Sequence, residues 1–263
     1  GLFSETGSGA VIENVEVAAD VTSNVASSSY GTAGLVGKVS GTTTITNCGV
    51  TGSVSNTSTN SYYTVRIGGL VGYLSAALEL NSCYNQANIN SASTYSSSAA
   101  GGLIGGSSFT YSVNAQNCYS TGNITAKSYA GGFIGYLNSS TSKPHTYTNC
   151  YTSGTVTGGS NKAYNFAYAY SVAAATFKNC YFNNKSDSKG CNGAVSNLEA
   201  KSTDELKDLA GTLGDGFRAD KQNINGGYPI LSWQYIDPTK THSVSFNVDP
   251  KDSVLTWNGP EPT

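Results

Sequence analysis

The chain has 263 residues and a formal net charge of −2, and charged residues make up only 11% of it. This length allows one large domain or two small ones. No cluster of lysine and arginine indicates binding to nucleic acid or to a membrane surface. No run of about 18 apolar residues could cross a bilayer, and a hydrophobic content of 38% argues against disorder.

A phrase of glycine and apolar residues recurs from the N-terminus onward. The intervals between copies are 30 to 35 residues. The copies read GLF at Gly1, GLVG at Gly34 and Gly69, GLIG at Gly102 and GFIG at Gly132, and the phrase decays to AYAY at Ala167.

A second phrase alternates with the first and keeps step with it over six units. It reads TNCGVTGSV at Thr46, NSCYNQANI at Asn81, QNCYSTGNI at Gln116, TNCYTSGTV at Thr148 and KNCYFN at Lys178. Two phrases that stay in register indicate a repeat architecture. The units are rich in β-branched residues and contain no helical periodicity, so they predict an all-β solenoid of about six coils over residues 1–184.

Stacking of the coils would place equivalent residues about 4.8 Å apart. The asparagines of the second phrase are expected to turn a corner and to hydrogen-bond inward from coil to coil; they are Asn47, Asn117, Asn149 and Asn179. The next residue is expected to point inward and to form a cysteine ladder, which comprises Cys48, Cys83, Cys118, Cys150 and Cys180.

The chemical state of these cysteines has two readings. Small buried hydrophobic residues are favoured, while disulfides between rungs or between Cys180 and Cys191 remain open. A zinc site is not expected, because no Cys-x-x-Cys occurs and the two histidines, His145 and His242, lie far apart. We expect no metal and no cofactor.

If the cysteines point inward, the residues that follow them point outward. They form a predicted column of Tyr84, Tyr119, Tyr151 and Tyr181, and a second column is expected at Tyr73 and Tyr136. Stacked tyrosines commonly just pack against each other on a strand face. The functional alternative is an exposed aromatic platform that binds sugar rings or a peptide.

The composition changes after Asn184. Ser202 and Glu205 form a capping box that predicts a helix over about 202–213, and an apolar strand is expected over about 228–234. We expect residues 185–237 to cap the last coil, because an open solenoid end exposes unpaired strand edges. Residues 238–263 alternate Val244, Phe246 and Val248, and are interpreted as a linker or as the first strands of a following Ig-like module rather than a strand docked on the solenoid.

The alternating GGLVG and NCYxxGxV phrases over about residues 1–184 resemble the GLUG repeat of bacterial surface proteins. The resemblance implies a right-handed parallel β-helix, and it implies an extracellular location in adhesins or in the non-catalytic parts of IgA-cleaving metallopeptidases. The first unit departs from the pattern with Val15 in place of cysteine, and the last unit has lost its glycines. The chain also lacks methionine, so we expect it to be part of a longer protein, with any signal peptide outside it.

The partners implied are host or environmental glycans or surface proteins, bound by a monomeric segment of a multidomain chain that neither binds nucleic acid nor inserts into a membrane. An adhesin-like structural or interaction role is therefore the first hypothesis. A carbohydrate-binding module that uses the tyrosine column is the second.

A polysaccharide-degrading enzyme is the weakest hypothesis. Such enzymes normally need paired carboxylates, and no Asp or Glu occurs between Leu80 and Ser186. The HExxH motif of metallopeptidases is absent. His145 follows a proline and is expected to be a surface-loop residue, and the acids Glu13 and Glu16 have no basic residue beside them.

Overall fold

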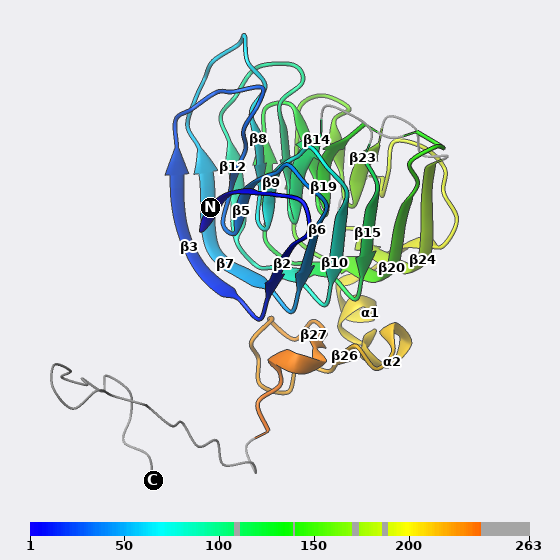
Figure 1. Ribbon diagram of the computed structural model, residues 1–263. Coiled ribbons are helices and arrows are strands. Elements are labelled where there is room, and N and C mark those ends of the chain that lie inside the picture. The colour runs from blue at the N-terminus through cyan, green and yellow to red at the C-terminus, as the bar shows by residue number, and fades with distance from the viewer. Residues whose placement is uncertain (108–110, 139, 170–173, 186–188, 238–263) are drawn as a thin grey trace, which may run out of the picture.

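In the computed structural model the chain winds into a β-solenoid whose strands run parallel from coil to coil (Figure 1). The structure describes residues 1–107, 111–138, 140–169, 174–185 and 189–237. The predicted solenoid is confirmed. Its longest regular face holds six stacked strands, which correspond to about five turns rather than six complete coils.

Three parallel sheets form the faces of the solenoid. The first contains β1 (Phe3–Thr6), β5 (Val36–Val39), β9 (Val71–Leu74), β14 (Ile104–Ser107), β19 (Ile134–Leu137) and β23 (Ala167–Ala169). The second contains β2 (Ala10–Glu13), β3 (Glu16–Ser23), β6 (Thr43–Thr46), β7 (Gly49–Asn56), β10 (Leu78–Asn81), β11 (Tyr84–Asn85), β12 (Asn88–Ser91), β15 (Val113–Gln116), β16 (Tyr119–Ser120), β17 (Ile124–Ala126), β20 (His145–Thr152), β21 (Val156–Thr157), β24 (Ala175–Asn183) and β25 (Leu198–Lys201). The third contains β4 (Thr32–Ala33), β8 (Arg66–Gly68), β13 (Ala99–Gly101), β18 (Tyr129–Gly131) and β22 (Ala163–Tyr164).

The repeated phrases stack in register, which explains why they recur at a nearly fixed interval. Apolar side chains alternate inward along each strand and fill the interior. One interior column runs from coil to coil through Ile12, Ile45, Leu80, Ala115, Tyr147 and Phe177, all of which are buried. Toward the C-terminal end this core becomes aromatic, since the rings of Phe133 and Phe166 stack with centroids 4.8 Å apart.

The asparagines of the second phrase turn a corner, as predicted. Asn47 and its counterparts have φ between 50° and 57°, the left-handed region that asparagine adopts more readily than most residues. The bend explains why Ile45 and Cys48 both point inward although they are three positions apart. The amides hydrogen-bond between coils: Asn149 Nδ2 donates to Asn117 Oδ1 over 3.1 Å, and Asn179 Nδ2 donates to Asn149 Oδ1 over 2.9 Å. These side chains are half-buried at the corner rather than inward, and Ser82 occupies one position of the column.

The glycines of the first phrase allow the first and third sheets to meet at a tight bend. A Cβ on Gly135 of β19 would lie 2.5 Å from the carbonyl oxygen of Ala100 in β13. A Cβ on Gly105 of β14 would likewise lie 2.5 Å from the backbone nitrogen of Ile67 in β8. Glycine is required because the backbones of the two sheets come this close. We call this bend the elbow.

The predicted helix over 202–213 is interrupted. It forms α1 (Thr203–Lys207) and α2 (Ala210–Leu213), and the capping box at Ser202 and Glu205 is present. The predicted strand over 228–234 is a two-residue strand, β27 (Ile230–Leu231), followed by a 3-10 helix (Ser232–Gln234); β27 pairs with β26 (Phe217–Arg218). We call residues 202–237 the cap segment.

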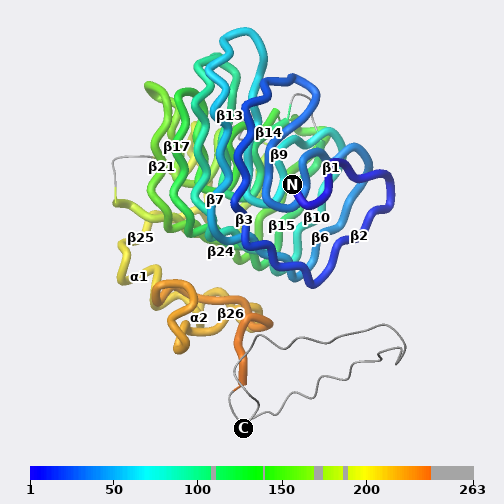
Figure 2. Tube along the Cα trace, turned by 90° about the vertical axis from the view of Figure 1, so that its left-hand side faces the viewer, coloured from blue at the N-terminus to red at the C-terminus, as the bar shows by residue number. Residues whose placement is uncertain are grey.

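The position of the cap segment differs from the prediction. It lies alongside the stack, below the coils in both views (Figures 1 and 2), and does not cover the open end of the last coil. That end is instead partly covered by residues 189–201. β25 pairs with β24, and Phe166 and Ala167 donate backbone hydrogen bonds to Gly190. The solenoid therefore continues past residue 184, where the sequence predicted its end.

Residues 238–263, interpreted as a linker or as the start of an Ig-like module, lie outside the described residues. Within the described part of the chain, no helix has the length and apolar character needed to span a membrane.

Candidate functional site

The predicted tyrosine column exists but is not exposed. Tyr84, Tyr119, Tyr151 and Tyr181 pair in register on neighbouring strands. The rings of Tyr84 and Tyr119 stack with centroids 5.3 Å apart, and those of Tyr119 and Tyr151 with centroids 5.2 Å apart. All four side chains are buried. The prediction of an exposed sugar-binding platform at this column is therefore wrong.

The cap segment is the reason that the column is buried. Its apolar side chains, including Leu206, Leu213, Phe217 and Leu231, form a hydrophobic cluster with the four tyrosines that is separate from the interior of the solenoid. The tyrosines thus point away from the solenoid core, as the alternation predicted. Sequence alternation fixes that direction, but it cannot show that another segment covers the face.

The phenol groups of the column are committed to hydrogen bonds. Tyr151 donates to the carbonyl oxygen of Pro229 over 2.5 Å and accepts from Asn225 Nδ2 over 2.8 Å. Tyr119 donates to Gln234 Oε1 over 3.0 Å, and Tyr84 donates to Glu16 Oε1 over 2.7 Å. Burial raises the pKa of each of these phenols above its ordinary value. The tyrosine column therefore forms an interface with the cap segment and is not a ligand site.

The cysteine ladder points inward, as predicted. Cys48, Cys83, Cys118, Cys150 and Cys180 are all fully buried, and these five and Cys191 are free thiols. The disulfides left open by the sequence are therefore not formed. Each ladder thiol lies near carbonyl oxygens; Cys83 Sγ, for example, is 3.3 Å from the oxygen of Ile45 and 3.2 Å from that of Asn81. Burial raises the pKa of the Cys83 and Cys150 thiols, which keeps them protonated and unreactive.

A different group of tyrosines remains accessible at the elbow. We call it the elbow cluster, and it consists of Tyr129, Tyr136, Tyr164 and Tyr168. All four side chains are half-buried. The ring of Tyr168 lies 4.5 Å from that of Tyr129, 5.3 Å from that of Tyr136 and 5.5 Å from that of Tyr164, measured between centroids. The outward-facing side chains of the first and third sheets meet here because the glycines fold the two sheets together.

The second predicted column divides between two environments. Tyr73 and Tyr136 lie in one outward column, with Gly106 between them. Tyr73 is buried, with the Arg66 guanidinium 4.5 Å from its ring centroid, whereas Tyr136 belongs to the half-exposed elbow cluster. The prediction of a second column is thus right about the register, but only its Tyr136 end offers an aromatic surface.

Sequence reasoning missed the other three members of the elbow cluster, although a signal was present. The last copy of the glycine phrase reads AYNFAYAY from Ala163, and Tyr164 pairs in register with Gly131. Glycine is needed at Gly131, where a Cβ would lie 1.9 Å from the carbonyl oxygen of Ile134. Tyr164 and Tyr168 of the decayed phrase extend the aromatic surface that Tyr129 and Tyr136 begin.

His145 is not the surface-loop residue that the sequence predicted. It begins β20, is fully buried, and its Nδ1 accepts a hydrogen bond from the backbone nitrogen of Val113 over 3.1 Å. Among the residues that the structure describes, Nε2 finds no hydrogen-bond partner. Desolvation lowers the pKa of this imidazole to about 4, so the ring is neutral near pH 7. The position falls at the inward register of Val113, which explains its burial.

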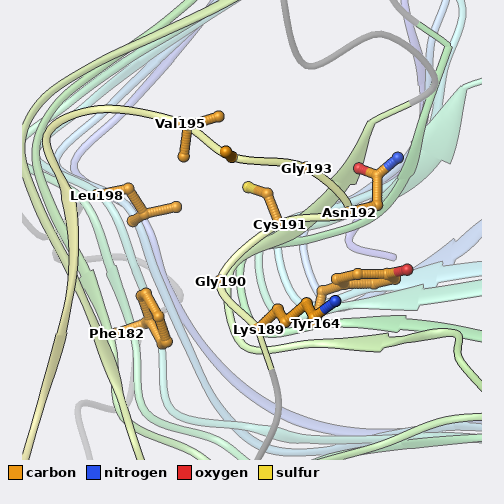
Figure 3. Close-up of a pocket in the computed structure, with 10 residues that line it drawn as sticks. Tyr164, Phe182, Lys189, Gly190, Cys191, Asn192, Gly193, Val195 and Leu198 are labelled. Carbon is orange, nitrogen blue, oxygen red and sulfur yellow. The ribbon is translucent and has the colours of Figure 1, made fainter.

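A pocket of about 440 Å³ lies at the C-terminal end of the solenoid (Figure 3). Phe182, Leu198, Val195 and Cys191 supply most of its apolar wall, while Tyr164 and Lys189 lie together at one side. Burial raises the pKa of the Cys191 thiol to about 12, so it is not a nucleophile near neutral pH. This wall can hold an apolar group, and the described residues that line it include no acid and base pair for catalysis.

The remaining candidate groups have structural roles. Glu16 accepts the hydrogen bond from Tyr84 and does not pair with Glu13. In the cap segment, the Asp220 carboxylate accepts from the backbone nitrogens of Ile224, Asn225 and Gly227, which makes it the anchor of a turn. Within the described ranges, no group of three or more His, Cys, Asp or Glu side chains is arranged to hold a metal ion.

Comparison of the chain with protein-family models, with curated proteins and with solved structures finds no match.

Proposed function

We propose that the chain is a non-catalytic, rigid interaction segment of a secreted or cell-surface bacterial protein, adhesin-like in its role. The observation that carries this proposal is the fate of the repeated residues. The cysteines fill the interior, the corner asparagines hydrogen-bond from coil to coil, and the tyrosine column binds the cap segment. These three sets of residues, which recur from unit to unit, serve to hold the fold together.

The resemblance of the two phrases to the GLUG repeat supports the placement at a bacterial surface. The free, buried thiols and the low content of charge are compatible with a stalk that projects other modules. The inner faces of the coils are filled by side chains, so ligands would have to bind to the outer surface.

Two measurements test this proposal: an assay for enzymatic turnover and a measurement of mechanical rigidity. The purified chain is incubated with a panel of polysaccharides and peptides, and release of reducing ends or of new amino termini is measured. We expect no turnover. Turnover that is lost in Glu13→Gln or Glu16→Gln would contradict the proposal. In parallel, pulling on single molecules should show cooperative unfolding of the stack, and extension at negligible force would contradict its role as a rigid segment.

A further inference from the structure

The elbow cluster differs from the rest of the outer surface in that its aromatic rings are already assembled and still accessible. Four half-buried tyrosines contact each other through Tyr168, and the rings of Tyr136 and Tyr168 are stacked with an angle of 16° between their planes. A ligand would therefore meet ordered rings. Tyrosine offers a large contact area at low conformational cost, since few rotatable bonds need to be fixed.

Among the described residues, the charged groups found next to the elbow cluster are basic. The ammonium group of Lys162 lies 4.4 Å from the ring centroid of Tyr129 and donates to the carbonyl oxygen of Ser96 over 2.8 Å. Lys127, two residues before Tyr129, is exposed. In the sequence, the stretch from Asn81 to Ser186 contains five lysines and no Asp or Glu. The coils that carry the cluster therefore attract anions and place no carboxylate of their own against them.

The phenols of Tyr129 and Tyr164 stay neutral at physiological pH. Burial, together with the neighbouring phenol of Tyr168, raises the pKa of Tyr129 to about 12. Burial also raises the pKa of Tyr164, whose hydroxyl donates to the carbonyl oxygen of Asn161 over 3.1 Å. A neutral phenol both donates and accepts hydrogen bonds, which suits ligands that carry many hydroxyl groups.

We propose that the elbow cluster, with Lys162, is a binding surface for an acidic polysaccharide. The tyrosine faces pack against the sugar rings, the phenols hydrogen-bond to sugar hydroxyls, and the lysine pairs with the carboxylate or sulfate. The cluster runs across the last coils from β18 to β23, so it presents several rings to a chain of sugars rather than one pocket to a single sugar. This proposal deepens the proposed function and rests on it.

Two acidic polymers and one neutral polymer test the proposal. Binding of the whole chain to polygalacturonate, chondroitin sulfate and dextran is measured by affinity electrophoresis and by calorimetry. We expect binding to one or both acidic polymers and much weaker binding to dextran. The two acidic arms distinguish recognition of a carboxylate alone from recognition of a sulfate. Equal binding to dextran would overturn the acidic class of ligand.

Matched variants locate the site. Tyr136→Ala with Tyr168→Ala should weaken binding by about tenfold or more, the effect expected for loss of aromatic anchors. Tyr62→Ala with Tyr63→Ala removes two exposed tyrosines elsewhere and should leave binding unchanged. Lys162→Gln should weaken binding by about threefold to fivefold, while Lys143→Gln, an exposed lysine of the same acid-free stretch, should have no effect.

The outcomes separate the two proposals. Absence of binding by the folded wild-type chain would overturn the elbow site and leave the non-catalytic role standing. Binding that the tyrosine pair and Lys162→Gln leave unchanged would show unspecific attraction to lysines and would also overturn it. If the double tyrosine variant loses its circular dichroism, Lys162→Gln decides, because it removes a charge without removing a ring. Cleavage of a polymer by the wild type would instead contradict the proposed function.

Discussion

The tyrosine column and the elbow cluster are built from the same side chain and have opposite fates. In both, outward-facing tyrosines stack at about the spacing of neighbouring strands, with ring centroids 5.2 Å apart for Tyr119 and Tyr151 and 5.3 Å apart for Tyr136 and Tyr168. The column lies under the cap segment, and the phenols of Tyr119 and Tyr151 hydrogen-bond to polar groups of that segment. The cluster lies on a face that the cap segment does not reach. The difference teaches that stacking alone does not make a binding surface, since coverage decides whether stacked rings stabilise the fold or remain available to a ligand.

The largest expected effect comes from removing one tyrosine ring from the column and, for comparison, one from the elbow cluster. Tyr151→Ala should lower the free energy of unfolding by about 3–5 kcal/mol, because it empties a buried aromatic site. Tyr164→Ala, in the elbow cluster, should lower it by less than about 1 kcal/mol. Urea denaturation followed by circular dichroism measures both. Equal losses in the two variants would remove the distinction between them.

The imidazole of His145 belongs to neither set of tyrosines and extends the comparison. It is buried, like the rings of the column, but it does not form a full set of hydrogen bonds. The folded-state pKa of His145 is lowered to about 4 from 6.5. The unfolded chain therefore binds the proton first as pH falls. Stability that is complete above pH 6.5 should decline toward pH 4, by about 3 kcal/mol in total.

Denaturation midpoints between pH 4 and pH 7.5 measure this decline. His145→Gln should flatten the dependence, and His242→Gln shows how much of it belongs to the other histidine. An unchanged slope in His145→Gln would show that folding does not lower the pKa of this imidazole.

The attachment of the cap segment to the column can be weakened at one residue. Asn225 is buried; its Oδ1 accepts from Gln86 Nε2 over 3.1 Å and from Thr121 Oγ1 over 2.9 Å, while its Nδ2 donates to Tyr151. Asn225→Ala should lower the free energy of unfolding by about 1–3 kcal/mol, since it leaves buried polar groups without partners. It should also speed the nitration of column tyrosines, which mass spectrometry can assign. Lys221→Ala, an exposed neighbour, is the control.

The smallest effect is a difference in titration that needs no mutation. The elbow phenol of Tyr129, with a pKa raised to about 12, should ionise in the folded chain. The column phenols, whose pKa values are raised by burial, should ionise only when the cap segment opens. A raised phenol pKa means that the folded state holds its proton longer, so stability falls as pH rises above about 10. The Cζ chemical shift of each tyrosine, followed by NMR beside circular dichroism, should show Tyr129 ionising before unfolding. Ionisation of Tyr129 only together with unfolding would contradict the accessibility of the cluster.

The sequence predicted those parts of the fold that repeat. The solenoid, the inward cysteines and the corner at Asn47 all follow from a period of 30 to 35 residues and from strand alternation. Asn197 was missed. It adopts the same left-handed corner conformation as Asn179, with φ of 59°, but follows it after only 18 residues and precedes Leu198 instead of a cysteine.

The parts that could not be predicted depend on contacts without a period. Asn225 reaches Gln86 across 139 positions and Tyr151 across 74. No local pattern in the cap segment shows which face of the stack it will cover, so the sequence could not predict that the tyrosine column is buried. The elbow cluster was partly visible, since Tyr136 stood in the expected column. Its contact with Tyr129 depends on the glycine bend that brings two sheets together.

The course of the cap segment also has a consequence for cooperativity. In a plain solenoid each coil touches only its neighbours, so the stack behaves as a one-dimensional chain and can fray from either end. Here the segment bonds to Ser82 through Trp233 and to Asn179 through the Thr212 carbonyl oxygen, and so spans several coils. Opening any one of those coils would break its contacts with the cap segment, so we expect these coils to unfold together. Residues 1–48 precede Ser82 and Asn179, so their amide protons should exchange with solvent before those of the coils that the cap segment spans.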